Sequence, residues 1–151
     1  MAPPMVVLRK ALLGIVVIGL VGTGVELLLL EHFDGWEQWI PLALFGAALL
    51  VLGWYAVGGA GASVLLFRGV MSLFVVIGVV GIFLHYRGNV EFELEMEPML
   101  RRLALFKAAM MGATPALAPG AMVQIGLIGL AWTWRHPALR VGSALPSTME
   151  S

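Results

Sequence analysis

Long apolar segments separated by short polar connections dominate the pattern of this chain. A helix needs about 20 predominantly apolar residues to cross the hydrocarbon core of a bilayer. Four segments reach or approach that length, so the pattern predicts an all-α integral membrane protein built as a bundle of four transmembrane helices. The predicted spans are residues 11–30, 39–57, 63–86 and 119–134, of which the last is the shortest.

The connection over residues 87–118 is much longer than the other two and carries two patterns of its own. Residues 90–97 alternate strictly between apolar side chains and glutamates, which is the period-two pattern of a strand. After Pro98, apolar residues recur at helical spacing as far as Gly112, with Arg and Lys elsewhere on the circumference. We therefore expect a short strand followed by an amphipathic helix that lies in the headgroup plane.

The composition agrees with a single membrane domain over residues 1–151. Hydrophobic residues make up 60% of the chain and charged residues 12%. A soluble domain carries roughly 25% charged residues. The net charge is zero, so no long-range field favours nucleic acid as a partner. Cysteine is absent, which excludes disulfides and thiolate metal sites.

The placement of Lys and Arg near the span ends predicts the orientation. Four spans put both termini on one side, and this side holds Arg9, Lys10, Arg68, Arg135 and Arg140. The other side holds Arg87, Arg101, Arg102 and Lys107, of which three belong to the predicted surface helix. We expect both termini, with the tail of residues 135–151, to be cytoplasmic in a bacterial cytoplasmic membrane. Eight of the nine acidic residues then lie on or close to the outer side.

Two short motifs raise the possibility of an internal duplication. Residues 32–35 and 85–88 both read His, aromatic, charged, Gly, and each follows a long apolar segment. Two helical hairpins related as a parallel repeat would produce this pattern. The alternative is that His, aromatic residues and Gly are common where helices reach the membrane interface.

Two polar residues lie inside predicted spans. Glu26 shares a helix face with Gly19 and Gly22, so we expect it to face the interior of the bundle. Gln124 lies at a similar depth in the last span, where the two side chains would form a hydrogen bond. A carboxylate inside a membrane is costly, and it indicates either a proton or cation site or a carboxyl group that joins two helices.

The histidines and the glutamate run are the other candidate ligands. His32 and His85 suit Zn, Cu, Fe or Ni, so they would bind a haem, or a metal ion together with Glu31. Alternatively, both are amphipathic residues at the interface. The glutamates of the predicted strand form either a solvated acidic surface or a divalent-cation site; they are Glu91, Glu93, Glu95 and Glu97. No cofactor is our first expectation, with haem or a divalent metal as the alternative.

The sequence contains no phosphate loop, nucleophile elbow, dinucleotide fingerprint or zinc-protease motif. We therefore expect an accessory or scaffold subunit of a membrane complex and not an enzyme. Its partners would be the lipid bilayer and other membrane subunits or further copies of itself. One alternative is a small transporter or ion-conducting oligomer that uses Glu26 and the acidic outer face. The other is a membrane redox protein with His32 and His85 as ligands.

Overall fold

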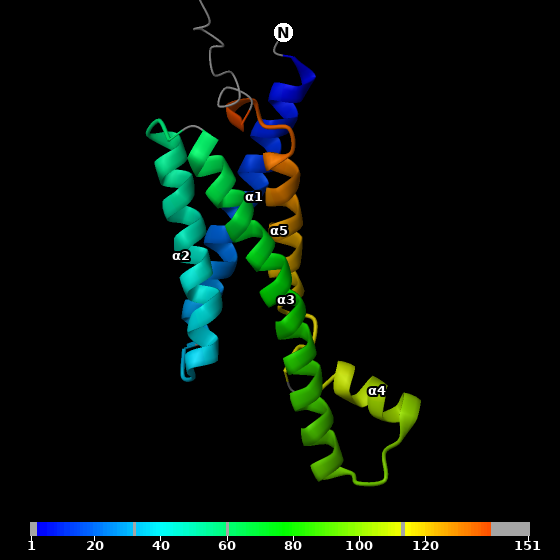
Figure 1. The fold of residues 1–151 in the computed structure, drawn as a ribbon. Coiled ribbons are helices and arrows are strands. Elements are labelled where there is room, and N and C mark those ends of the chain that lie inside the picture. Colours follow the sequence, from blue (N-terminus) through cyan, green and yellow to red (C-terminus); the bar gives the residue numbers. More distant parts are fainter. Residues whose placement is uncertain (1–2, 32, 60, 113, 140–151) are drawn as a thin grey trace, which may run out of the picture.

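The computed structural model describes residues 3–31, 33–59, 61–112 and 114–139, and within these ranges the chain is helical with no strand. Figure 1 shows the elements along the chain. They are α1 (Pro4–Leu29), α2 (Trp36–Ala56), α3 (Gly61–Met96), α4 (Arg102–Met110), α5 (Gly120–Thr133) and a short 3-10 turn at Pro137–Leu139.

Three of these helices, α1, α2 and α3, are long and apolar enough to cross a membrane. This confirms the membrane class that the sequence predicts. The helix α5 is also apolar but has only 14 residues. At 1.5 Å per residue it is about 21 Å long, which is shorter than a hydrocarbon core of about 30 Å.

The four apolar helices lie side by side, with α3 and α5 forming the most extensive contact (Figure 1). The helix α5 runs antiparallel to α3, because Pro119 lies near Gly81 whereas Gly129 lies near Met71. The helix α1 packs on the other side of α5, and α2 packs against α3 and α1. The start of α1 and the end of α5 consequently meet at the same end of the bundle.

Close backbone approach joins α3 to α5. An added Cβ at Gly126 would lie 2.8 Å from the Met71 carbonyl oxygen, and one at Gly78 would lie 2.7 Å from a Val123 methyl group. Small residues at these points let the two helix backbones approach, which is how helices associate where water supplies no hydrophobic driving force. Between α2 and α3, the Phe45 and Phe74 rings pack edge to face with their centroids 4.9 Å apart.

The predicted strand is wrong, because α3 continues as a single helix to Met96. Gly120, near the start of α5, lies opposite Ile82, so residues 83–96 carry α3 about 20 Å beyond that point. Glu, Leu and Met are strong helix formers, and they extend a helix that already exists. An isolated strand would lack a pairing partner. The helix ends just before Pro98, which disfavours helical backbone in the residue preceding it.

The helix predicted after Pro98 is confirmed as α4, although it is shorter than expected. A buried side chain, Asn89, connects it to α3. The Asn89 amide nitrogen donates to the carbonyl oxygens of Ala109 at 2.8 Å and Thr114 at 2.6 Å. The Thr114 amide donates back to the Asn89 side-chain oxygen at 3.3 Å. We call α4 together with residues 83–96 of α3 the outer hairpin.

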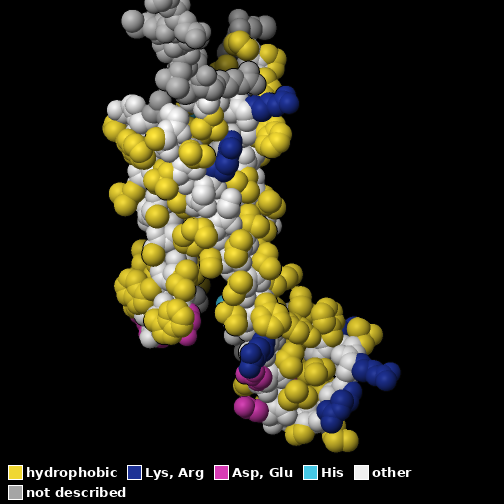
Figure 2. All heavy atoms as spheres, viewed as in Figure 1, with side chains coloured by type: hydrophobic (Ala, Val, Ile, Leu, Met, Phe, Trp, Pro, Cys, Tyr) yellow, Lys and Arg dark blue, Asp and Glu magenta, His cyan; other side chains and the backbone are white. Residues whose placement is uncertain are grey.

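The outer hairpin exposes both large apolar side chains and cations (Figure 2). In Figure 1, α4 lies beside the last turns of α3, at about the level of the turn between α1 and α2. Leu103 is 64% and Phe106 50% exposed, and Arg101, Arg102 and Lys107 are also exposed. Around the helix, Leu103 and Phe106 lie between Arg102 and Lys107, so α4 lacks the separate apolar and charged faces that the sequence led us to expect.

The two motifs behind the suggested duplication have different conformations. Around residues 31–35 the chain leaves α1 through a turn, with Glu31 at φ 51°, whereas residues 85–88 lie within the uninterrupted helix α3. The repeat is therefore not visible in the backbone at this point. His32 itself lies outside the described residues.

Candidate functional site

The expectation that Glu26 faces the bundle interior is wrong. Glu26 is exposed, and in the described part of the chain it has no hydrogen bond to Gln124. Glu26 does share a face with Gly19, which packs against Ile125 of α5. The first residues of α5, however, reach only to about the level of Thr23 on α1, so none of the described helices covers Glu26.

Gln124 is also exposed, within a groove between α1 and α5. The groove has a volume of about 290 Å³ and is mostly apolar, and its lining includes Ile18, Gly19, Thr23 and Ala121. No described residue forms a hydrogen bond with the Gln124 amide. Glu26 and Gln124, the two polar residues that the sequence singles out, therefore both lie on the lateral surface of the bundle and not in its interior. A proton or cation site at this surface would need a second chain to enclose it.

The two candidate metal ligands are not brought together in the described residues, since His32 lies outside them. His85 is half-buried in α3, and its Nδ1 lies 3.2 Å from the Pro115 carbonyl oxygen. Nδ1 donates a hydrogen bond to this oxygen in the tautomer that carries the hydrogen on Nδ1. Glu31 is exposed in the turn after α1. Within the described ranges no group of three or more His, Asp or Glu side chains is placed to hold a metal ion. Haem or metal ligation stays a prediction.

The glutamates of the outer hairpin do not form the row that a strand would give. On α3, Glu91 and Glu95 share one face, whereas Glu93 lies on another and Glu97 follows the end of the helix. Glu91 accepts a hydrogen bond from Arg87 at 2.8 Å in an exposed ion pair. The run is thus an acidic helix end beyond the α1–α2 turn, without the single carboxylate face expected for a hard cation.

The most elaborate polar cluster lies at the opposite end, around the C-terminus of α5. Arg9 of α1 donates to the carbonyl oxygens of Trp132 at 2.8 Å and of Trp134 and Arg135 at 3.0 Å each. Arg68 of α3 donates to the carbonyl and hydroxyl oxygens of Thr133 at 2.7 and 3.2 Å. The last carbonyls of a helix lack partners within the helix and carry partial negative charge, so two guanidinium groups stabilise this end.

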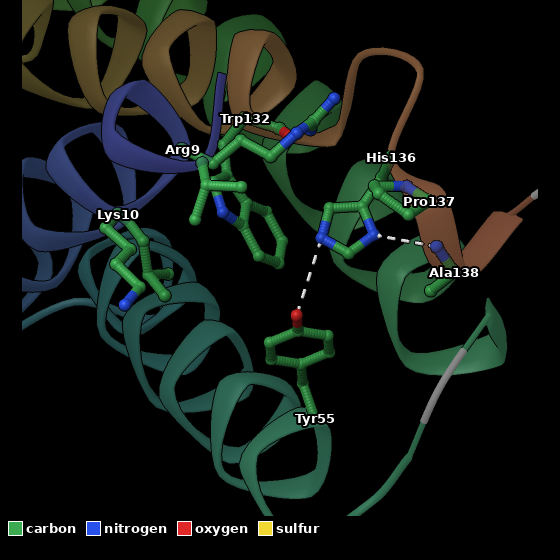
Figure 3. A pocket seen from close by; sticks show the side chains of 9 residues that line it. Arg9, Lys10, Tyr55, Trp132, His136, Pro137 and Ala138 are labelled. Carbon is green, nitrogen blue, oxygen red and sulfur yellow. Dashed lines mark hydrogen bonds between the residues drawn. The ribbon is translucent and has the colours of Figure 1, made fainter. Parts of the chain in front are cut away.

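His136 lies inside this cluster and is 6% exposed. The Ala138 amide donates to its Nδ1 at 3.2 Å, so the proton of the neutral ring resides on Nε2. Nε2 lies 3.4 Å from the Tyr55 hydroxyl oxygen and donates to it (Figure 3). The Tyr55 hydroxyl hydrogen is consequently available to donate to another group.

A groove of about 390 Å³ opens beside these side chains, between the start of α1, the end of α2 and the segment after α5 (Figure 3). Trp132 is buried beneath it and packs edge to face against Tyr55 at 5.3 Å and Phe67 at 5.5 Å. We call this feature the basic groove. It is lined by Val6, Arg9, Lys10, Leu13, Tyr55, Trp132, His136, Pro137 and Ala138.

The protonation of His136 should make stability depend on pH. Burial lowers the pKa of His136 below its usual value of 6.5, and the positive charge of Arg9 lowers it further. The unfolded chain then binds this proton more readily than the folded chain, so the free energy of unfolding falls as the pH drops from about 6.5 through the folded-state pKa. Among the described residues, the other ionisable groups around this end of the bundle are Tyr55, Lys10, Arg68 and Arg135.

The measurement is thermal unfolding in one detergent between about pH 7.5 and pH 5. His136→Asn keeps a polar side chain but removes the titration, so the variant should lose less stability than the natural chain over this interval. Parallel pH curves for the two proteins would contradict the assignment.

Sequence reasoning missed His136 and the role of Tyr55. The signal was faint: a lone His-Pro pair after the last span, and a tyrosine 81 residues earlier. In the sequence, Arg9 and Arg68 indicate only the orientation of the spans.

Comparison with protein-family models, curated proteins and solved structures finds no match to this chain.

Proposed function

We propose that this chain is a four-span protein of the bacterial cytoplasmic membrane that serves as an accessory or scaffold subunit of a membrane complex. In this arrangement α5 is the fourth span, both termini are cytoplasmic, and α4 lies along the outer surface. The short α5 is suited to this place because α1 and α3 flank it on two sides. Trp134 and the cluster around Arg9 mark its inner end, since aromatic residues and cations favour the interface.

Labelling of single cysteines tests this orientation, because the natural chain has none. Val57 is 85% and Trp134 69% exposed at the inner end, and Glu97 is exposed in the outer hairpin. We expect a membrane-impermeant maleimide to label Glu97→Cys in intact cells, and Val57→Cys and Trp134→Cys only after permeabilisation. The reverse pattern would overturn the orientation. Labelling of Trp134→Cys together with Glu97→Cys would show that α5 does not cross the membrane.

The observation that carries the subunit proposal is the exposed Gln124 in the groove between α1 and α5. An amide side chain that faces hydrocarbon without a hydrogen-bonding partner is unfavourable. The residues beside it on the groove, Thr23 and Ala121, are small and would let another helix approach closely. Glu26 continues the polar surface toward the outer end, where a lipid-facing carboxylate would also be costly. A transmembrane helix of a partner subunit would cover Gln124, the small residues beside it and Glu26.

Photocrosslinking in the native membrane tests this proposal. A benzophenone amino acid replaces Ile18, which lines the groove and is 74% exposed, or Leu50 of α2, which is 77% exposed. We expect a discrete protein adduct from position 18 and only lipid adducts from position 50. Lipid adducts alone from both positions would contradict a bound subunit. An adduct with twice the mass of this chain would show that the partner is a second copy of the chain and not another subunit.

A further inference from the structure

The inner end of the bundle carries positive charge that no carboxylate in the described chain neutralises. Arg9, Lys10, Arg68 and Arg135 gather there, and Figure 2 shows basic side chains at this end. The described acidic residues lie on the outer half of α1, at the turn into α2, and on the outer hairpin. Arg9 and Arg68 donate hydrogen bonds to carbonyl oxygens. Because these oxygens carry no formal charge, the positive charge of the two guanidinium groups is not neutralised. An anionic ligand would complement this end.

The basic groove presents hydrogen-bond donors of the kind that bind phosphate oxygens. Lys10 is exposed at its margin and has no hydrogen bond to any described residue, so its ammonium group is available. Across the groove, the Tyr55 hydroxyl accepts from His136 and keeps its own hydrogen for a ligand (Figure 3). Arg9 also lines the groove and adds positive charge.

The rest of the groove is apolar, which favours a lipid over a soluble anion. Val6 and Leu13 lie one helical turn before and after the cations on α1, so the lining continues along a helix that crosses the bilayer. Trp132 and Ala138 contribute further apolar surface. A free phosphate would gain nothing from these side chains, whereas the glycerol and acyl chains of a phospholipid would bury against them. The volume of about 390 Å³ is within the range of small-molecule sites.

We propose that the basic groove binds the phosphate headgroup of an anionic phospholipid of the inner leaflet. Lys10 and Arg9 supply the charge, the Tyr55 hydroxyl donates to a phosphate oxygen, and an acyl chain follows Val6 and Leu13. No described carboxylate is present to pair with the ammonium group of a zwitterionic headgroup, so anionic lipids are preferred. Basic pockets between transmembrane helices on the cytoplasmic side recognise such headgroups. The assignment to the inner leaflet rests on the orientation proposed above, whereas the headgroup site itself depends neither on that orientation nor on whether a partner subunit covers Gln124.

The test uses the full chain, purified in a mild detergent, with phosphatidylglycerol and phosphatidylcholine of identical acyl chains as probes. Native mass spectrometry counts bound lipids, and thermal unfolding measures stabilisation. The variant Lys10→Gln removes a charge without breaking any described contact. Lys107→Gln is the matched control, because Lys107 is the only other lysine and lies exposed on α4 at the other end. Inorganic phosphate is added in a parallel arm.

We expect phosphatidylglycerol to bind and to raise the unfolding temperature, while phosphatidylcholine and inorganic phosphate do neither. Lys10→Gln should weaken phosphatidylglycerol binding about fivefold, which corresponds to about 1 kcal/mol for one basic residue at a membrane surface. Lys107→Gln should bind as the natural chain does. Equal binding of the two lipids, equal losses in the two variants, or stabilisation by inorganic phosphate alone would each overturn the proposal.

Discussion

Gly126→Ala is expected to lower the free energy of unfolding by about 1–3 kcal/mol, the range for overpacking a close contact. The new Cβ would lie 2.8 Å from the Met71 carbonyl oxygen and 3.0 Å from the Phe74 Cβ, distances that real Cβ atoms rarely or never show. Two of the three nearest atoms belong to or are fixed by the α3 backbone, so no flexible side-chain end can move aside. The helices α3 and α5 must therefore separate along their main contact.

Gly69→Ala is the matched control for this substitution. Gly69 lies on α3 and an added Cβ there meets nothing within 4 Å. Alanine has the higher helix propensity, so the control should leave stability unchanged or raise it slightly. Thermal unfolding of the three proteins in one detergent makes the comparison. Equal unfolding temperatures for Gly126→Ala and the natural chain would show that α3 and α5 do not depend on close backbone approach.

Three of the four expected spans could be predicted because the membrane class depends on composition over long segments and not on particular contacts. The end of α3 could not, because residues 90–97 satisfy two patterns at once. Their alternation is that of a strand, but their residues favour a helix and follow one directly. Intrinsic propensity and continuity with α3 outweighed periodicity over so short a run.

The face on which Glu26 lies could not be predicted from spacing alone. Its helical neighbour Gly19 does pack against α5, as the small-residue rule suggests. The sequence does not reveal where α5 begins relative to α1. Because α5 begins at about the level of Thr23, it does not reach Glu26. The contact between Tyr55 and His136 was equally hidden, because it depends on how α2 and the segment after α5 meet in space.

The other large effect is expected from Asn89→Leu in the outer hairpin. Leucine has a similar volume but would leave the carbonyl oxygens of Ala109 and Thr114 and the Thr114 amide without their partner. Each unsatisfied group costs about 1–3 kcal/mol when it stays buried, so the hairpin should instead open to water. The bundle, which Asn89 does not contact through any described hydrogen bond, should keep its unfolding temperature.

Amide hydrogen exchange over residues 102–112 measures this opening, and we expect it to become much faster in Asn89→Leu while exchange in α5 stays the same. Glu91→Gln is the control on the same part of α3. It breaks only the ion pair with Arg87, whose side chains are 64% and 60% exposed, and such pairs contribute less than about 1 kcal/mol. Unchanged exchange in Asn89→Leu would mean that the ring contact between Tyr86 and Phe106, at 5.9 Å, holds the hairpin without the amide. Faster exchange in both variants would place the hairpin's stability in the ion pair, against the geometry around Asn89.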